Sequence, residues 1–302
     1  MTMPVQRLAS ATAVVRWGQG SHAFEIRSPD EAVLERAAVV FEPWRHVAAD
    51  ALPAAAWTVV PGPGRDEWSI QTTVDPDVVV RGDRMRAVRL VEVFAVQALM
   101  DSPRDMLTLH AALVAREDLG VLILGAGESG KSTLAAALWQ RGFSLLGDDI
   151  AIIDPATTDA APAPRRVSLR SGSRELVGAD LWARILAASS SERTLEGVVF
   201  HPQDVDGAPR PRAARLAACV FLNRPHVELP SGVAKLIPAA SAVLALLPAS
   251  NLIRRYEAGV VIERLAPLAA RVPAYDLARA PLDAMCAAVE TLLEQGRAER
   301  PR

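Results

Sequence analysis

The sequence predicts an α/β fold in which a P-loop domain follows a smaller α+β region. Short apolar segments alternate with helical ones, a glycine-rich loop joins a buried-type strand to a helix, and this pattern begins only after about residue 104. With 302 residues, the chain is long enough for two modest domains. We therefore expect an N-terminal α+β region over 1–104. A P-loop domain with a mixed sheet and flanking helices is expected over 105–302.

The first region contains short strands and two helices. A helix is predicted at 30–41, where Asp30 precedes apolar residues at helical spacing, and another at 84–100. The glycines and prolines of 60–68 predict a loop. Pro103 makes continuation of the second helix costly and marks the boundary. Four alternating or continuously apolar segments predict strands at 12–17, 22–27, 68–74 and 77–82.

The second region alternates strands and helices. The segment 120–125 is apolar on both faces, which is typical of a central strand in a covered sheet. Gly142 is expected to follow the end of the next helix, and the Pro- and Ala-rich segment 155–166 to form a loop. The other expected strands are 108–115, 143–149, 150–154 and 216–223. The expected helices are 131–142, 239–249 and 282–298.

Composition excludes several classes of protein. The net charge of −2 argues against a nucleic-acid partner, since such proteins usually carry a basic face. Two widely separated cysteines, Cys219 and Cys286, argue against a disulfide framework or a four-ligand zinc site. No segment has the length and apolar character of a membrane span or a signal peptide. We expect a soluble cytoplasmic protein with neither nucleic acid nor membrane as a partner.

The segment GAGESGKST at 125–133 predicts a phosphate cradle. It fits the pattern G-x-x-x-x-G-K-[ST], also called Walker A, and it stands between a strand and a helix as that pattern requires. Glycines let the backbone wrap closely round a polyphosphate, and the helix N-terminus presents unpaired N–H groups. The lysine would reach the outer phosphates, and the serine hydroxyl would bind Mg²⁺. The expected ATP-binding residues are Gly125, Ala126, Gly127, Glu128, Ser129, Gly130, Lys131, Ser132 and Thr133.

Three further side chains suggest what happens to the phosphate. Asp148 and Asp149 end the strand that follows the P-loop helix, so one acid can meet Mg²⁺ while the other accepts a proton from an attacking hydroxyl. His110 precedes the P-loop strand and is expected at the same end of the sheet, where it could orient an acid or contact a phosphate. A polar strand end and a structural histidine are the simpler alternatives.

The order and spacing of these residues resemble the catalytic domain of HPr kinase/phosphorylase. That family shows a strand histidine, a P-loop, a helix ending in Arg-Gly and a strand ending in Asp-Asp, as do residues 106–150 here. A looser likeness continues to the C-terminal strand and helix. The first 100 residues look more like divergent relatives, some of which modify peptides, for example in lasso-peptide biosynthesis.

The resemblance implies a role for each matching residue. Asp149 matches the acceptor of the proton from the target serine, and His110 the histidine that assists it. Lys131 matches the P-loop lysine, and Ser132 the hydroxyl that binds Mg²⁺. Glu175 is the acid in the stretch matching the family's downstream magnesium ligand, which with Ser132 and Asp148 completes the expected metal set. The resemblance also implies a possible homo-oligomer. The family's segment linked to phosphorolysis ends in a strand with a glutamate, which the matching segment 210–224 lacks, so we expect kinase activity and make no claim of phosphorolysis.

Three functions stay open at this point. The first is a kinase that uses ATP and Mg²⁺ to phosphorylate a serine of a protein or peptide substrate, with Asp149 as general base. The second is a small-molecule kinase on the same scaffold, in which only the acceptor pocket differs. The third is a nucleotide-dependent binding or assembly module with slow ATP hydrolysis.

Overall fold

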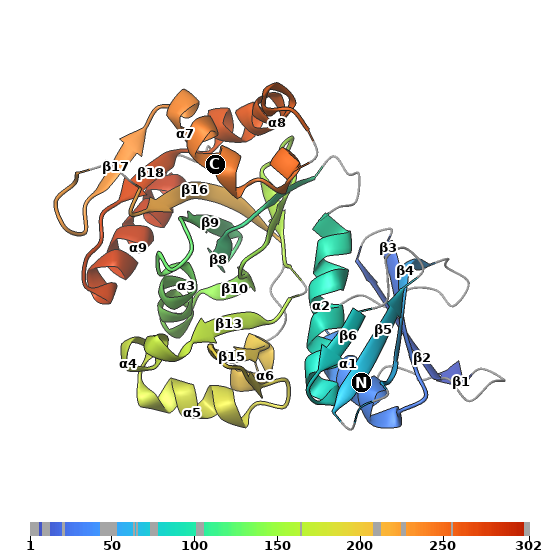
Figure 1. The fold of residues 1–302 in the computed structure, drawn as a ribbon. Helices are drawn as coiled ribbons and strands as arrows, with labels where there is room; N and C mark the ends of the chain where they lie inside the picture. Colours follow the sequence, from blue (N-terminus) through green and yellow to red (C-terminus); the bar gives the residue numbers. More distant parts are fainter. Residues whose placement is uncertain are drawn as a thin grey trace. The chain divides into compact units, whose positions relative to one another are not determined.

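The structure is a computed structural model that consists of two compact units, Met1–Ser102 and Pro103–Arg302 (Figure 1). This division lies two residues before the expected boundary near residue 104. Each unit is described by itself. The described residues are 6–7, 13–19, 22–42, 53–62, 64, 66–72, 78–100, 106–163, 165–207, 213–224, 228–254 and 256–298.

The first unit is a six-stranded sheet with two helices packed against it. The strands follow each other in chain order across the sheet, and every neighbouring pair is antiparallel except β3 and β4. Helices α1 (Glu31–Val40) and α2 (Arg84–Met100) also contact one another. The strands are β1 (Gln6–Arg7), β2 (Ala13–Gln19), β3 (His22–Ser28), β4 (Pro53–Pro61), β5 (Glu67–Thr72) and β6 (Val78–Arg81).

Helix α1 begins where its capping residue predicted. The side chain of Asp30 accepts a hydrogen bond of 2.9 Å from the backbone N–H of Ala32, which satisfies one of the unpaired donors of the first turn. The predictions of helices at 30–41 and 84–100 are confirmed, whereas β4 was not expected. Its alanine- and proline-rich sequence lacks a strand pattern, and its parallel pairing with β3 places it in the sheet.

The second unit is built on a nine-stranded mixed sheet. Strand β9 runs between antiparallel β8 and parallel β16 and is buried along its whole length, as its apolar sequence predicted. The path across the sheet is β10 (Ser144–Gly147), β8 (Ala112–Arg116), β9 (Leu119–Leu124), β16 (Ala214–Leu222), β12 (Asp159–Ala161), β11 (Ala151–Ile153) and β7 (Leu107–Leu109). Beside β16, a branch adds β18 (Ala274–Leu277) and then β17 (Ala234–Ile237).

Helices cover both faces of this sheet (Figure 1). Val121 and Ile123 of β9 pack in one apolar cluster with α3 (Lys131–Gln140) and α9 (Leu282–Ala298). Leu122 and Leu124 point the other way and pack with α7 (Ala239–Leu246) and α8 (Ala258–Arg271). The alternation of side chains along β9 therefore supplies both cores.

A small separate sheet lies beside α3. Its antiparallel strands are β13 (Val167–Arg170), β15 (Gly197–Phe200) and β14 (Glu192–Arg193), in that order. Helices α4 (Arg174–Val177), α5 (Ala179–Ala187) and α6 (Pro202–Asp206) accompany it. Leu169 and Phe200 join the same apolar cluster as α3, so β13 is held close to the start of that helix.

The chain around His110 corrects one prediction. The single strand expected at 108–115 is wrong, because β7 ends at Leu109 and β8 begins at Ala112. Strand β7 pairs with β11, whereas β8 pairs with β9 and β10, so the chain changes partners between them. The backbone N–H of His110 leaves the sheet and donates 2.7 Å to the carbonyl of Ala249. His110 therefore lies in a bend and not within a strand.

Other predicted elements are present, but some begin or end at different residues than predicted. Gly142 follows α3 with φ of 87°, and the N–H groups of Gly142 and Phe143 donate to Trp139 and Leu138, which is a Schellman motif. The helix expected at 239–249 ends as α7 at Leu246 and continues as a short 3₁₀ turn that contains Pro248. The predicted loop 155–166 contains strand β12. No helix of the described residues has both the length and the apolar character required to cross a membrane.

Candidate functional site

Two glycines of the loop between β9 and α3, Gly125 and Gly130, occupy positions where a side chain would be unfavourable. Gly130 caps α3 in the left-handed region, with φ of 95° and ψ of 13°. A Cβ on Gly125 would lie 2.5 Å from Oγ of Ser129 and 3.1 Å from the carbonyl oxygen of Leu222. The first position of the motif is thus closed to a side chain by its surroundings. The helix N-terminus after Gly130 has no side-chain cap, which leaves its N–H groups available to a ligand.

Lys131 lies under this loop. Its residue is only 5 % exposed, and its Nζ donates to the carbonyl oxygens of Gly125 at 2.9 Å and Ala126 at 3.2 Å. Burial lowers the pKa of Lys131, while the carboxylates of Asp149 and Asp148 act in the opposite direction. The ammonium is therefore held by neutral carbonyl groups, which an anion in the loop can replace.

Ser132 is connected to the first of the two adjacent acids. Its hydroxyl donates 2.7 Å to Oδ1 of Asp148, and the backbone N–H of Ser168 donates 3.0 Å to Oδ2. Asp148 is buried, with 1 % exposure. Burial and the charge of Asp149 raise the pKa of Asp148 to about 6, although both hydrogen bonds act to lower it. The structure thus places Oγ of Ser132 beside a carboxylate whose negative charge is costly because it is buried.

Asp149 differs from its neighbour in conformation and in contacts. Its backbone is left-handed, with φ of 61°, a conformation that aspartate tolerates better than most residues. Its carboxylate is partly exposed, and Oδ2 lies 3.3 Å from Nη1 of Arg165. Nδ1 of His110 lies 3.2 Å from the backbone oxygen of Asp149, so Nδ1 must carry the proton of that hydrogen bond. His110 therefore holds the peptide of Asp149 and not its carboxylate.

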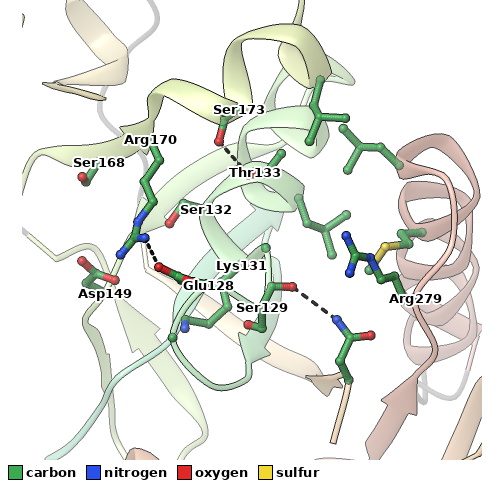
Figure 2. Close-up of a pocket in the computed structure, with 18 of the residues that line it drawn as sticks. Glu128, Ser129, Lys131, Ser132, Thr133, Asp149, Ser168, Arg170, Ser173 and Arg279 are labelled. Carbon is green, nitrogen blue, oxygen red and sulfur yellow. Dashed lines mark hydrogen bonds and ion pairs between the residues drawn. The ribbon is translucent and has the colours of Figure 1, made fainter. Parts of the chain in front are cut away.

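Most of these residues line one cavity of about 860 Å³ in the second unit, whereas Asp148 and Arg165 do not belong to its lining (Figure 2). In Figure 2, Asp149, Ser168 and Arg170 lie on one side of the loop, and Arg279 lies on the other. The motif residues Gly127 to Thr133 form the floor between them. The structure therefore brings His110, Asp149, Lys131 and Ser132 into one cavity from three separate parts of the chain.

Two further arginines contact this part of the site: Arg170 lines the cavity, and Arg165 contacts Asp149. Arg170, at the end of β13, forms ion pairs with Glu128 of the loop and, at 3.7 Å, with Glu196. Arg165 precedes β13 and pairs with Asp149 as described. No local motif marks either arginine in the sequence. The proximity of β13 to α3 places them here, and that contact joins residues some 35 positions apart.

Glu175, the expected third metal ligand, does not line this cavity. It is exposed on α4, and the lining takes Ser173 and Leu176 from that part of the chain. Ser173 shares a hydrogen bond of 2.9 Å with Thr133, which joins α4 to α3. Within the described residues, no three His, Cys, Asp or Glu side chains are grouped so that they could hold a metal ion. The role implied for Glu175 thus gains no support from its position.

Comparison with known proteins gives no match to a family model or a curated sequence, but it does give similarities to solved structures. Among solved structures, the chain is similar to the HPr(Ser) kinase/phosphatase from Coxiella burnetii, with 18 % identity and a TM-score of 0.35. The match covers 64 % of this chain and 91 % of that one. A similarity of this size carries no argument about activity, so the function must be argued from the cavity itself.

Proposed function

We propose that this chain is an ATP- and Mg²⁺-dependent kinase that transfers the γ-phosphate to a serine hydroxyl of a protein or peptide. One observation carries the proposal. The buried lysine and the serine of a glycine loop line one cavity together with an accessible aspartate, Asp149, and that serine is hydrogen-bonded to the buried Asp148. The loop lysine and the serine–Asp148 pair suit a polyphosphate and its cation, and Asp149 suits a group that takes up a proton.

The residues present fit Mg²⁺. The cation prefers hard oxygen ligands, and in nucleotide sites it is usually bound by one or two carboxylates together with the substrate phosphates. Oγ of Ser132 and Oδ1 of Asp148 lie 2.7 Å apart, and both would serve as ligands or hold a coordinated water. When bound, Mg²⁺ would neutralise negative charge on the phosphates. It would also favour the ionised form of Asp148, which burial now opposes.

The chain's own residues divide the remaining work. Backbone N–H groups at the start of α3 would bind phosphate oxygens. Nζ of Lys131, which now donates to two carbonyl oxygens, would instead donate to the phosphate oxygens. The carboxylate of Asp149 would accept the proton that leaves the attacking serine hydroxyl. Arg165 holds that carboxylate by an ion pair and His110 holds its peptide, so both act as positioning residues.

The difference between the two acids favours transfer over binding alone. A module that merely holds a nucleotide needs Asp148 for the cation but has no evident use for a second, accessible carboxylate beside it. Asp149 lines the cavity and is partly exposed, whereas Asp148 is buried and accepts two hydrogen bonds. This arrangement suits one acid to the metal and the other to the acceptor hydroxyl.

Incubation with ATP labelled at the γ-position tests the proposal. The protein is mixed with a cell extract or with the products of neighbouring genes, and a Lys131→Ala variant serves as the control. Label on a serine of a protein or peptide, absent with the variant, supports the proposal. Label on a metabolite would instead identify a small-molecule kinase, and label only in free phosphate would identify a nucleotide-dependent module with slow hydrolysis. Either of those results would overturn the serine-kinase proposal.

A further inference from the structure

The cavity continues beyond the loop 125–133, here called the phosphate loop, on the side away from Asp149 (Figure 2). There its wall is formed by the segment that follows β18 and by the beginning of α9. The lining residues from this segment are Arg279, Ala280, Pro281, Leu282 and Met285. This side offers carbon surface and one guanidinium group, whereas the Asp149 side offers carboxylates and their arginine partners.

The guanidinium group of Arg279 has no carboxylate partner among the described residues. The nearest acids in the sequence are committed to other arginines: Asp276 accepts two hydrogen bonds from Arg224, and Asp283 accepts one of 2.7 Å from Arg141. Arg279 is exposed and belongs to the cavity lining. An unneutralised planar cation beside apolar side chains is suited to stack on an aromatic ring.

The backbone that carries this wall is held in place. The carbonyl oxygen of Arg279 accepts a hydrogen bond of 3.2 Å from Oγ of Ser231, and the N–H of Ala278 donates 3.2 Å to Val233. Helix α9 starts at Leu282, and the buried Met285 anchors its first turn in the core. The wall is therefore part of the folded domain and is present before any ligand binds.

The direction of a bound nucleotide follows from the proposed function, on which this inference rests. If the outer phosphates lie over the loop and face Asp149, the nucleoside must extend towards the opposite end of the cavity. A volume of about 860 Å³ is within the range of small-molecule sites and leaves room for more than a triphosphate. The end lined by Arg279 is the one with surfaces suited to a flat ring.

We infer that Arg279, Pro281, Leu282 and Met285 form the nucleobase end of the cavity, with the Arg279 guanidinium stacked on the face of a purine ring. Apolar contact comes from the proline, leucine and methionine. Stacking requires only a π-face, so recognition here depends on ring area, and purine nucleotides bind more tightly than pyrimidine nucleotides.

Calorimetry with two ligands tests this assignment. ATP and inorganic triphosphate, both with Mg²⁺, are titrated into wild type, Arg279→Ala and Arg279→Lys, with Arg184→Ala on the exposed face of α5 as a matched control. Both Arg279 variants are expected to lose affinity for ATP by roughly 3- to 30-fold, because lysine keeps the charge but not the plane. Their affinity for triphosphate stays within about twofold of wild type, and Arg184→Ala changes neither ligand.

The same titrations separate failure of this inference from failure of the proposed function. An equal loss of ATP and triphosphate affinity in Arg279→Ala would make Arg279 a phosphate contact and overturn the assignment. Unchanged ATP affinity in that variant would also overturn it. If wild type binds neither ligand, the phosphate loop itself is wrongly assigned, and the proposed function fails together with its nucleobase end.

Discussion

The hydroxyl group of Ser132 donates a hydrogen bond of 2.7 Å to Oδ1 of Asp148, a carboxylate that is 1 % exposed. The fold thus keeps an acid in a buried position where its ionisation is costly, and its pKa is raised to about 6. Proteins accept such a cost where a ligand later offsets it. The Ser132–Asp148 pair is therefore the structural feature that most directly supports the proposed cation site.

Asp148→Asn is expected to stabilise the protein in the absence of nucleotide and Mg²⁺. The pKa of Asp148 in the folded protein, about 6, lies above the 3.8 of an ordinary aspartate, so the stability associated with protonated Asp148 is lost as pH rises through about 6. At pH 7 that loss is on the order of 3 kcal/mol or less, and asparagine avoids it. The side chain can still accept from Ser168 and donate to Ser132. Urea denaturation should show that the free energy of unfolding of the variant, relative to that of wild type, increases between about pH 4 and pH 7.

Asp180→Asn provides the control for that experiment, because Asp180 is exposed on α5. The difference in unfolding free energy between this variant and wild type should not increase across the same pH range. An Asp148→Asn difference that stays constant with pH would contradict the account of the buried carboxylate. With Mg²⁺ and ATP present, the sign reverses, since the variant loses a charged ligand while wild type gains binding free energy.

Glu128→Gln is expected to strengthen ATP binding. Glu128 lies in the phosphate loop, and its carboxylate pairs with Arg170, with both side chains more than half exposed. The pair therefore contributes little to stability, but it places a negative charge beside the phosphate position and occupies an arginine. Removing the charge should raise ATP affinity about two- to fivefold without changing Tm.

A second variant shows whether Glu128 acts through Arg170. Arg170→Ala should lower ATP affinity, and the gain from Glu128→Gln should shrink in that background, which calorimetry on the double variant measures. Glu263→Gln, exposed on α8, serves as the charge-matched control. Weaker ATP binding in Glu128→Gln would show that this carboxylate supports the ligand and does not oppose it.

Gly125→Ala and Gly127→Ala should behave differently although they are two residues apart. A methyl group at Gly125 meets Ser129 at 2.5 Å and a backbone carbonyl at 3.1 Å, whereas one at Gly127 meets nothing within 4 Å. Gly125→Ala is expected to cost roughly 1–3 kcal/mol of unfolding free energy, and Gly127→Ala less than about 0.5 kcal/mol. Thermal and urea unfolding measure both, and equal losses would contradict the geometry described for the loop.

Local patterns allowed much of the second unit to be predicted. The strand β9, the glycine loop and helix α3 follow one another in the sequence, so spacing and glycine positions identify them together. The same holds for two residues at helix ends, Asp30 before α1 in the first unit and Gly142 after α3 in the second, which could also be identified from the sequence. Each of these features depends on residues within a few positions of one another.

Contacts between distant segments could not be predicted in the same way. Arg170 pairs with Glu128 of the loop and Arg165 pairs with Asp149 because β13 lies against α3, and Arg279 lines the cavity from the segment after β18. Nothing near these arginines in the sequence distinguishes them from arginines that lie elsewhere on the surface. The break at His110 was missed for a related reason: apolar residues lie on both sides of His110, and the change of strand partner depends on β11 and β9.

The most direct test of the central claim is phosphate transfer by Asp149→Asn. Asparagine tolerates the left-handed backbone at this position and keeps the size of the side chain, so the fold and the loop should be preserved. The variant is expected to bind ATP within about twofold of wild type and to transfer the γ-phosphate roughly 100- to 10,000-fold more slowly. Transfer at the wild-type rate would contradict the assignment of Asp149 as the group that accepts the serine proton.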